Sequence, residues 1–282
     1  MKKFIPILFF ACVAFSASAQ AKLETKKFKI SDLCERTMEM VLTGNTIVDA
    51  AYRDKAQDVW HISPYEFCTV EQFEQRKKSR EYYFIVLTDN SFGKETSPGI
   101  KFLSMYKGDP KAREGVDGLY KITSVPFCSA DWGDGREATV LPAMLNAIQQ
   151  QALSILGKEF NIGEVIRVSG RNVLGDWPGK ILIADCDLAF ERNADASAEP
   201  DSYVKITDPD TLSAAMADRE DCLVGYVVAP ENPEKGSVCF TYLINAATYE
   251  LHYMRRRNIS NSSPAGFTRS ELKGFELHSF GK

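Results

Sequence analysis

A glycine-rich run at residues 133–138 is the first place where this chain could do chemistry. The run is Gly-Asp-Gly-Arg-Glu-Ala, which matches the G-x-G-x-x-A pattern of loops that hold a dinucleotide pyrophosphate at a helix start. Three carboxylates, Asp131, Asp134 and Glu137, would repel a diphosphate, and Pro142 favours a helix that begins several residues later. We therefore interpret the run as a tight acidic loop, and we expect no cofactor.

The same loop carries the best candidate contact residue, Trp132, which lies between Asp131 and Asp134. A loop tryptophan flanked by carboxylates can stack on a sugar or anchor a partner chain. The alternative, which we favour, is that the indole folds back over the edge of a sheet. If the chain has a binding surface, we expect Asp131, Trp132 and Asp134 to form part of it.

Motifs for hydrolytic and metal chemistry are absent from the sequence. It contains no H-E-x-x-H, C-x-x-C, G-x-S-x-G or P-loop pattern, and its three histidines, at positions 61, 252 and 278, are far apart. We expect His61 to be a packed or edge histidine and not a base. A triad assembled from distant residues stays open, because geometry and not sequence order defines one.

Two groups of acidic residues could be taken for calcium ligands. Neither has the alternating ligands, central glycine and terminal glutamate of an EF-hand loop, so we expect solvated loops and no metal site. The two groups are Asp185, Asp187, Glu191 and Asp195, and Asp131, Asp134 and Glu137.

Six cysteines follow the first nineteen residues, and an even number in an exported protein invites a disulfide interpretation. Cys222 and Cys239 lie in neighbouring expected strands. With a loop over residues 229–237, however, Val228 would face Val238, and Cys222 would then lie too far from Cys239 to bridge. We expect buried reduced thiols for most of the six, which are Cys34, Cys68, Cys128, Cys186, Cys222 and Cys239.

Two stretches of the chain repeat the same order of elements, which indicates an internal β-α-β-β duplication with Phe84 and Tyr226 at matching places. Each stretch has a short strand, a helix, a buried strand and a further strand after a Pro/Gly loop. The first stretch comprises residues 60–62, 70–80, 82–87 and 100–106, and the second comprises residues 203–206, 208–219, 223–228 and 238–244. Asp210-Thr211-Leu212 fits an O-glycosylation acceptor pattern, but capping of the second helix is the interpretation we favour for Thr211.

The remaining elements complete an α/β pattern, with α+β as the alternative. The longest helix is expected over residues 140–158, with Pro142 in its first turn and Gly157 near its end. Other segments are a helix at 47–59, strands at 119–127, 165–168 and 180–184, an acidic linker at 191–202 and a final segment at 271–280.

The first nineteen residues have the features of a secretory signal peptide: Lys2 and Lys3, an apolar run over 4–15, and small residues at 17 and 19 before Gln20. Cys12 leaves open a lipid-anchored alternative. The rest of the sequence contains no segment long and apolar enough to cross a membrane. A net charge of −4 argues against a nucleic-acid partner, which requires clustered cations.

Several short motifs resemble those of a family of exported Bacteroidetes-type proteins of unknown function. They include residues 64–67 (Pro-Tyr-Glu-Phe), 71–74 (Glu-Gln-Phe-Glu), 82–84 (Tyr-Tyr-Phe) and 179–183 (Gly-Lys-Ile-Leu-Ile). The resemblance implies a location in the cell envelope or outside the cell, and it implies no activity and no catalytic residue.

Together these patterns predict an α/β protein of two related β-α-β-β modules with mixed sheets flanked by helices. The expected division is a signal peptide over 1–19, a first module over 20–136 and a second over 137–282. We expect an exported, periplasmic or secreted protein that binds an envelope partner or a small ligand without catalysis. The alternative is a hydrolase of glycan or peptide with its site between the modules.

Overall fold

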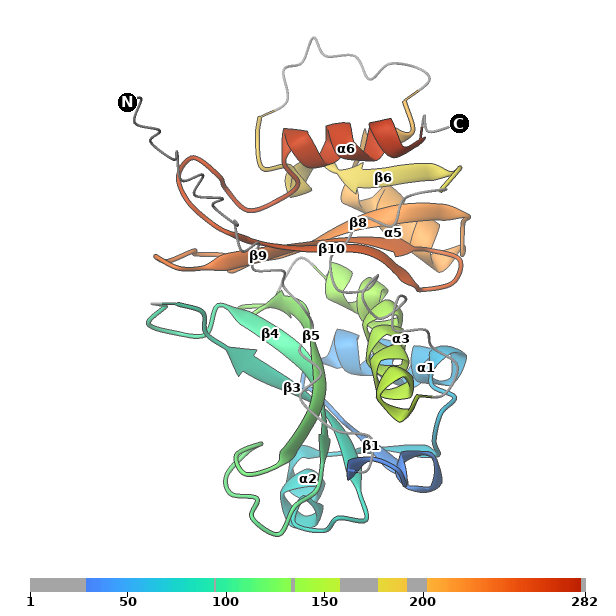
Figure 1. Cartoon of the computed structure of the whole chain (residues 1–282), viewed down its shortest axis with the longest axis vertical. Helices are drawn as coiled ribbons and strands as arrows, with labels where there is room; N and C mark the ends of the chain where they lie inside the picture. The colour runs from blue at the N-terminus through green and yellow to red at the C-terminus, as the bar shows by residue number, and fades with distance from the viewer. Residues whose placement is uncertain (1–28, 94, 133–134, 158–176, 192–201, 280–282) are drawn as a thin grey trace, which may run out of the picture.

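Two five-stranded mixed sheets, stacked with helices between and around them, form the protein (Figure 1). The computed structural model describes residues 29–93, 95–132, 135–157, 177–191 and 202–279. The signal segment, the expected strand at 165–168, Asp134 and most of the acidic linker lie outside these residues. Within the described residues no helix has the length and apolar character needed to cross a bilayer.

The first sheet, sheet A, has the strand order β2-β1-β3-β4-β5. β1 is parallel to β2 and β3, whereas β3, β4 and β5 form an antiparallel meander. Its elements are β1 (Met38–Val41), α1 (Thr46–Val59), β2 (Tyr65–Cys68), α2 (Val70–Arg76), β3 (Tyr83–Asn90), β4 (Ile100–Lys107), β5 (Tyr120–Ser129) and α3 (Arg136–Leu156).

The second sheet, sheet B, repeats this topology strand for strand, with the order β7-β6-β8-β9-β10 when read from the parallel end. β6 is parallel to β7 and β8, and β8, β9 and β10 are antiparallel. Its elements are β6 (Lys180–Ala184), β7 (Val204–Thr207), α5 (Pro209–Ala217), β8 (Cys222–Val228), β9 (Val238–Asn245), β10 (Leu251–Asn258) and α6 (Arg269–Ser279). The expected α/β fold with two similar modules is therefore confirmed.

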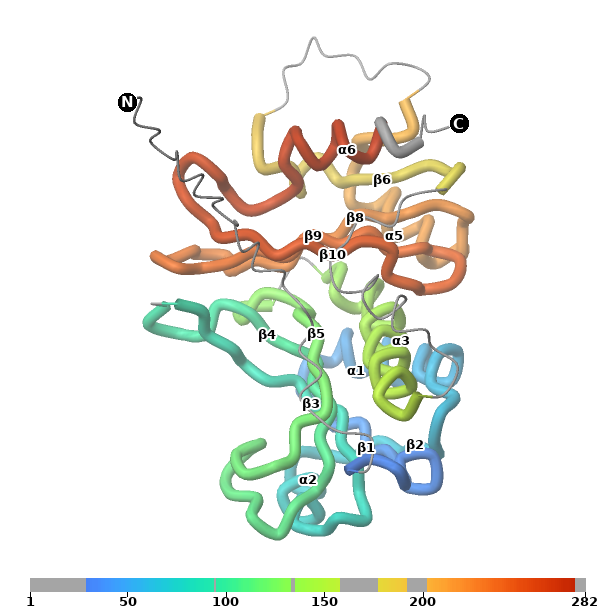
Figure 2. The backbone as a smooth tube through the Cα atoms, in the orientation of Figure 1, coloured from blue at the N-terminus to red at the C-terminus, as the bar shows by residue number. Residues whose placement is uncertain are grey.

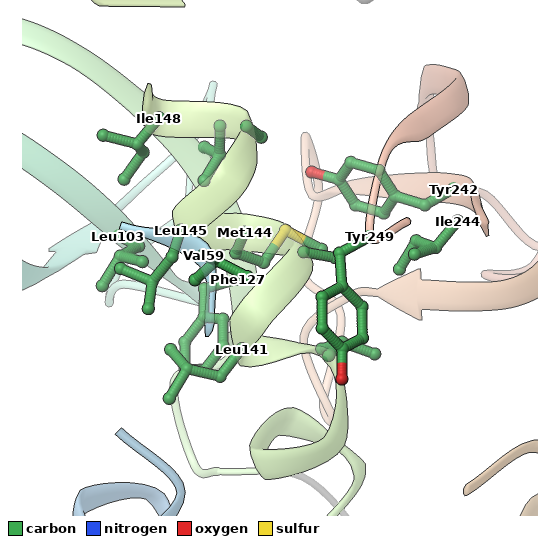
Figure 3. Close-up of a cluster of buried hydrophobic side chains, with 14 of the residues drawn as sticks. Val59, Leu103, Phe127, Leu141, Met144, Leu145, Ile148, Tyr242, Ile244 and Tyr249 are labelled. Atoms are coloured by element: carbon green, nitrogen blue, oxygen red, sulfur yellow. The ribbon is translucent and has the colours of Figure 1, made fainter. Parts of the chain in front are cut away.

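One hydrophobic core joins the two units. Helix α3 lies between the sheets, and Figure 3 shows Leu145 and Ile148 on the side of Leu103 while Tyr242 and Ile244 approach from sheet B. Two smaller cores lie outside this layer, one under α2 and one under α6. The two sheets are thus stacked, with α3 in the layer between them and α6 on the face of sheet B that is turned away from sheet A (Figure 2).

Helix caps explain where several elements begin and end. Asn45 accepts hydrogen bonds from the first amides of α1, and Thr69 with Gln72 forms a capping box on α2. Asp208 caps α5 by accepting hydrogen bonds from the amide and hydroxyl of Thr211, so Thr211 lies in the first turn of the helix and Asp208 is the cap. Gly157 ends α3 in the left-handed conformation, as expected.

Two assignments made from the sequence are wrong. The short strand of the first unit is β2 at Tyr65–Cys68 and not residues 60–62, because α1 continues to Val59 and the Trp60 amide still bonds to Ala56. Helix α3 begins at Arg136, which places Pro142 in its interior. The helix tolerates the missing amide because it is buried on several sides, which supplies contacts that offset one lost hydrogen bond.

The strand registers correct two further details. Leu223 of β8 corresponds by register to Tyr83 of β3, so Phe84 corresponds to Val224 and not to Tyr226.

The β8–β9 hairpin also differs from its expected register. Val228 lies opposite Phe240 and not Val238, and the same register, continued by one residue, aligns Cys222 with Ala246. Cys222 and Cys239 do not face each other, and none of the six cysteines in the described residues forms a disulfide.

Candidate functional site

The loop after β5 places Trp132 in a conformation that a bulky residue rarely adopts. Its φ is 60°, in the left-handed region, and its amide donates to the Ser129 carbonyl at 3.2 Å. The indole is half-buried and packs back against the main core, as the favoured alternative expected. A non-glycine residue held in this region stores strain that surrounding contacts must offset, and such residues concentrate at functional sites.

A cation holds the indole in place. The Lys101 ammonium lies 5.5 Å from the centre of the Trp132 ring, and it pairs with the Asp89 carboxylate at 2.7 Å. Asp131 is exposed beside the indole, and its amide bonds to the Ser129 hydroxyl. The structure therefore brings together Asp131 and Trp132 from the sequence analysis and adds Lys101 and Asp89. Asp134 lies outside the described residues.

A second polar site joins the two units at the start of α3. The Arg136 guanidinium forms a bidentate salt bridge with the Asp187 carboxylate, at 2.7 Å from Nη1 to Oδ2 and 2.9 Å from Nη2 to Oδ1. Both side chains are nearly buried, and the guanidinium lies 5.7 Å from the centre of the Tyr226 ring. This corrects the expectation that Asp187 belongs to a solvated loop. The carboxylate of Asp187 is instead buried against Arg136, a residue distant in the sequence.

Asp187 follows β6 at the topological switch point of sheet B, where open α/β sheets commonly bind ligands. A cavity of about 10 Å³ lies close by and is lined in part by Arg136, Thr139, Ser213 and Tyr226. That volume holds about one water molecule. Arg136 of the first unit thus occupies the crevice that a ligand would use in the second.

The corresponding switch point of sheet A is also occupied by a side chain of the protein. The Asp49 carboxylate accepts hydrogen bonds from the amide of Thr43 at 2.7 Å and of Gly44 at 3.1 Å. In the same way, Glu137 is buried and accepts a hydrogen bond from the Gly135 amide at 3.0 Å. These amides are the groups that a phosphate would need, so the geometry does not support a dinucleotide at either place.

Tyrosine hydroxyls close the outer edge of β5. The hydroxyls of Tyr242 and Tyr226 donate to the carbonyls of Pro126 and Phe127, each at 3.0 Å. The β4–β5 register shifts at this place, so Phe127 has no paired residue on β4. Two tyrosine hydroxyls of sheet B therefore supply hydrogen-bond donors to carbonyls of β5 at the edge of sheet A.

A buried carboxylate under α2 is the residue that sequence analysis missed. Glu39 on β1 is completely buried, and its Oε1 accepts a hydrogen bond from Arg76 at 2.5 Å. Its Oε2 has no hydrogen-bond partner within the described part of the chain. Burial raises the pKa of this carboxyl, although Arg76 and Cys68 oppose the shift. The second unit has Leu182 at the corresponding position of β6, so this charge is not required by the fold.

Three buried thiols are poorly suited to nucleophilic chemistry. Burial raises the pKa of Cys68 and Cys128 to about 12 and that of Cys222 to about 11, which keeps these thiols protonated and inert. Burial lowers the pKa of His252. His61 is exposed at the end of α1, which agrees with an edge position. Within the described residues no group of three or more histidine, cysteine, aspartate or glutamate side chains is placed to hold a metal ion.

No protein-family model, curated protein sequence or solved structure matches this chain.

Proposed function

We propose that this chain is an exported, non-catalytic binding protein of the cell envelope or the extracellular space. The observation that carries the proposal is the strained backbone of Trp132, whose ring is held by Lys101 beside the exposed Asp131. An indole with a carboxylate at its side offers a stacking surface and a hydrogen-bond acceptor, which suits the hydroxyl-rich rings of a glycan.

The alternative function is hydrolysis of a glycan or peptide at a site between the modules. Apolar side chains from both sheets fill that region, and its nearly buried carboxylate, Asp187, is bound by Arg136. This packing favours binding over hydrolysis. The resemblance to exported proteins of unknown function adds support for the compartment.

A sedimentation assay tests both functions on the same polymer. The mature protein is mixed with purified peptidoglycan sacculi and centrifuged, and the supernatant is analysed for released reducing ends. We expect the protein to sediment without releasing sugars, Trp132→Ala to lose most of the binding, and Trp132→Phe to keep part of it. Failure to sediment, or equal binding by the Trp132→Ala variant, would refute the glycan-binding proposal. Release of reducing ends would support the hydrolase.

The compartment has its own test. Intact mass measurement of the protein from a periplasmic fraction should give a chain that begins at Gln20. A lipid-modified Cys12 would support the anchored alternative, and a chain that begins at Met1 would refute export.

We also propose that the two units arose by internal duplication, on the strength of their identical strand order and pairing directions. The division proposed from the sequence, residues 20–136 and 137–282, assigns α3 to the second module. The topology matches α3, which follows β5, with α6, which follows β10. On this basis the repeat boundary belongs after Leu156.

A further inference from the structure

Among the residues that the structure describes, the outer edge of strand β2 has no hydrogen-bond partner. A sheet edge presents unpaired amides and carbonyls, and proteins usually cover or charge it. The other three edge strands, β5, β7 and β10, are each partly covered or charged. Tyr226 and Tyr242 bond to β5, Glu276 accepts from the amides of Tyr203 and Val204 at the start of β7, and β10 carries Arg255, Arg256 and Arg257.

The backbone of β2 points half of its hydrogen-bonding groups away from the sheet. The ladder to β1 begins with the Met38 amide on the Pro64 carbonyl at 2.8 Å and ends with the Leu42 amide on the Cys68 carbonyl at 2.9 Å. In a parallel pair only alternate residues face the neighbouring strand. The amides and carbonyls of Tyr65 and Phe67 therefore face outward, and no hydrogen bond to them occurs among the residues that the structure describes.

One face of this edge is aromatic and held rigidly. The rings of Tyr65 and Phe67 meet edge to face at 5.9 Å, and Phe67 meets Tyr52 of α1 at 5.6 Å. The Arg53 guanidinium lies 5.5 Å from the Phe67 ring. Both Tyr65 and Phe67 are half-buried, so their exposed surfaces flank the open edge. Such a surface favours apolar side chains on an added strand.

The other face carries an unbalanced negative charge. Glu66 and Glu39 share a single guanidinium, that of Arg76, at 2.9 Å and 2.5 Å. Two carboxylates with one guanidinium leave a net charge of about −1 when all three are ionised. Glu39 is buried, whereas the side chain of Glu66 is 52% exposed. A cation on an added strand opposite Glu66 would complete this charge group.

We propose that the open edge of β2 binds an extended peptide segment of a partner protein, with a lysine or arginine between two apolar residues. The backbone of the peptide adds a strand to sheet A through the outward groups of Tyr65 and Phe67. Its apolar side chains lie on the aromatic face, and its cation lies against Glu66. This interaction is separate from the glycan surface at Trp132.

Pairing with a second copy of this chain is disfavoured by the same charge. An antiparallel pair of β2 strands that joined Tyr65 of one copy to Phe67 of the other would place the two Glu66 side chains opposite each other. A dimer in analytical ultracentrifugation that Phe67→Pro disrupts would overturn the peptide proposal in favour of self-association.

Fluorescence anisotropy with two labelled peptides tests the proposal directly. The probes are acetyl-Thr-Val-Lys-Val-Thr-amide and the same peptide with Glu in place of Lys. We expect the full mature protein to prefer the Lys peptide by up to about fivefold, the range of a cross-strand charge pair. Glu66→Lys should reverse the preference, while Glu231→Lys, an exposed charge reversal on the β8–β9 loop, should keep it.

A proline at position 67 tests the backbone contact. Phe67→Pro removes an outward amide together with the Phe67 ring, without breaking a bond to β1, so it should abolish binding of both peptides while circular dichroism stays unchanged; Phe67→Ala removes the ring alone and should only weaken binding. If the proline variant does not fold, the charge reversal at Glu66 decides the proposal alone. Equal affinity for both peptides, no reversal by Glu66→Lys, or no binding at millimolar protein would overturn it.

Discussion

Replacing Arg136 with methionine should strongly destabilise the protein, because it breaks the ion pair at the junction of its two units. The substitution leaves the Asp187 carboxylate without its two hydrogen bonds of 2.7 Å and 2.9 Å. The side chain of Asp187 is only 5% exposed, so water cannot replace the guanidinium freely. Removing one partner of a buried ion pair costs about 3–5 kcal/mol.

The structure favours the lower part of this range. The Arg136 side chain is 13% exposed and lines a cavity of about 10 Å³, so one water can enter the space that the guanidinium leaves. Loss of the contact with the Tyr226 ring adds about 0.5–1 kcal/mol. We therefore expect the free energy of unfolding to fall by about 3–4 kcal/mol, a large share of the about 5–15 kcal/mol typical of a folded protein.

Urea unfolding followed by circular dichroism measures this change, and a double-mutant cycle isolates the pair. Arg136→Met combined with Asp187→Leu should be more stable than Arg136→Met alone, because no buried charge remains. The matched control is Arg113→Met, which removes an exposed arginine whose ion pair to Asp117 is 3.5 Å long. Its cost should stay below about 1 kcal/mol. A loss of less than about 1 kcal/mol for Arg136→Met, or no recovery in the double variant, would refute the reasoning.

Three other substitutions test features of the two units. Glu39→Gln should raise stability at pH 8 and remove a pH dependence. Burial raises the pKa of Glu39 in the folded state, so the native protein binds this proton more tightly and loses stability as pH rises through that pKa. Urea midpoints that change equally between pH 5 and pH 8 in wild type and variant would contradict this. Tyr242→Phe should cost about 1–3 kcal/mol, because the buried Pro126 carbonyl loses its donor, and an unchanged unfolding midpoint would argue against that hydrogen bond. Gly266→Ala should lower the melting temperature, because φ is 113° and the new Cβ would lie 2.5 Å from the Asp187 carbonyl oxygen; a melting temperature equal to that of wild type would show that the loop adjusts.

The second unit was predicted well because its local signals are strong. Asp208 and Pro209 mark a helix start, and the nearly continuous apolar runs of β8 and β9 flank a Pro/Gly loop. In the first unit the signals conflict. The aromatic residues 60–62 suggested a strand, although Trp60 is the cap of α1. Glu39 interrupts a four-residue apolar run, so β1 was not recognised as a buried strand.

The candidate site could be predicted only where it is local. Trp132 was found because a tryptophan between acidic residues is conspicuous in the sequence. Its partner Lys101 lies on β4, and the salt bridge between Arg136 and Asp187 joins residues from different units. No periodicity or motif encodes such distant contacts. They follow from the way the sheets stack, which depends on the complete fold.

Because α3 is covered by sheet B, the order in which the chain is synthesised has a consequence for its folding. When the ribosome has made the first 157 residues, Met144 and its apolar neighbours have no partner on one side. This apolar side of α3 stays exposed to solvent until β8 and β9 are made, roughly a hundred residues later. The first half of the protein therefore depends on the second half to cover its apolar surface, and chains that end after α3 should aggregate.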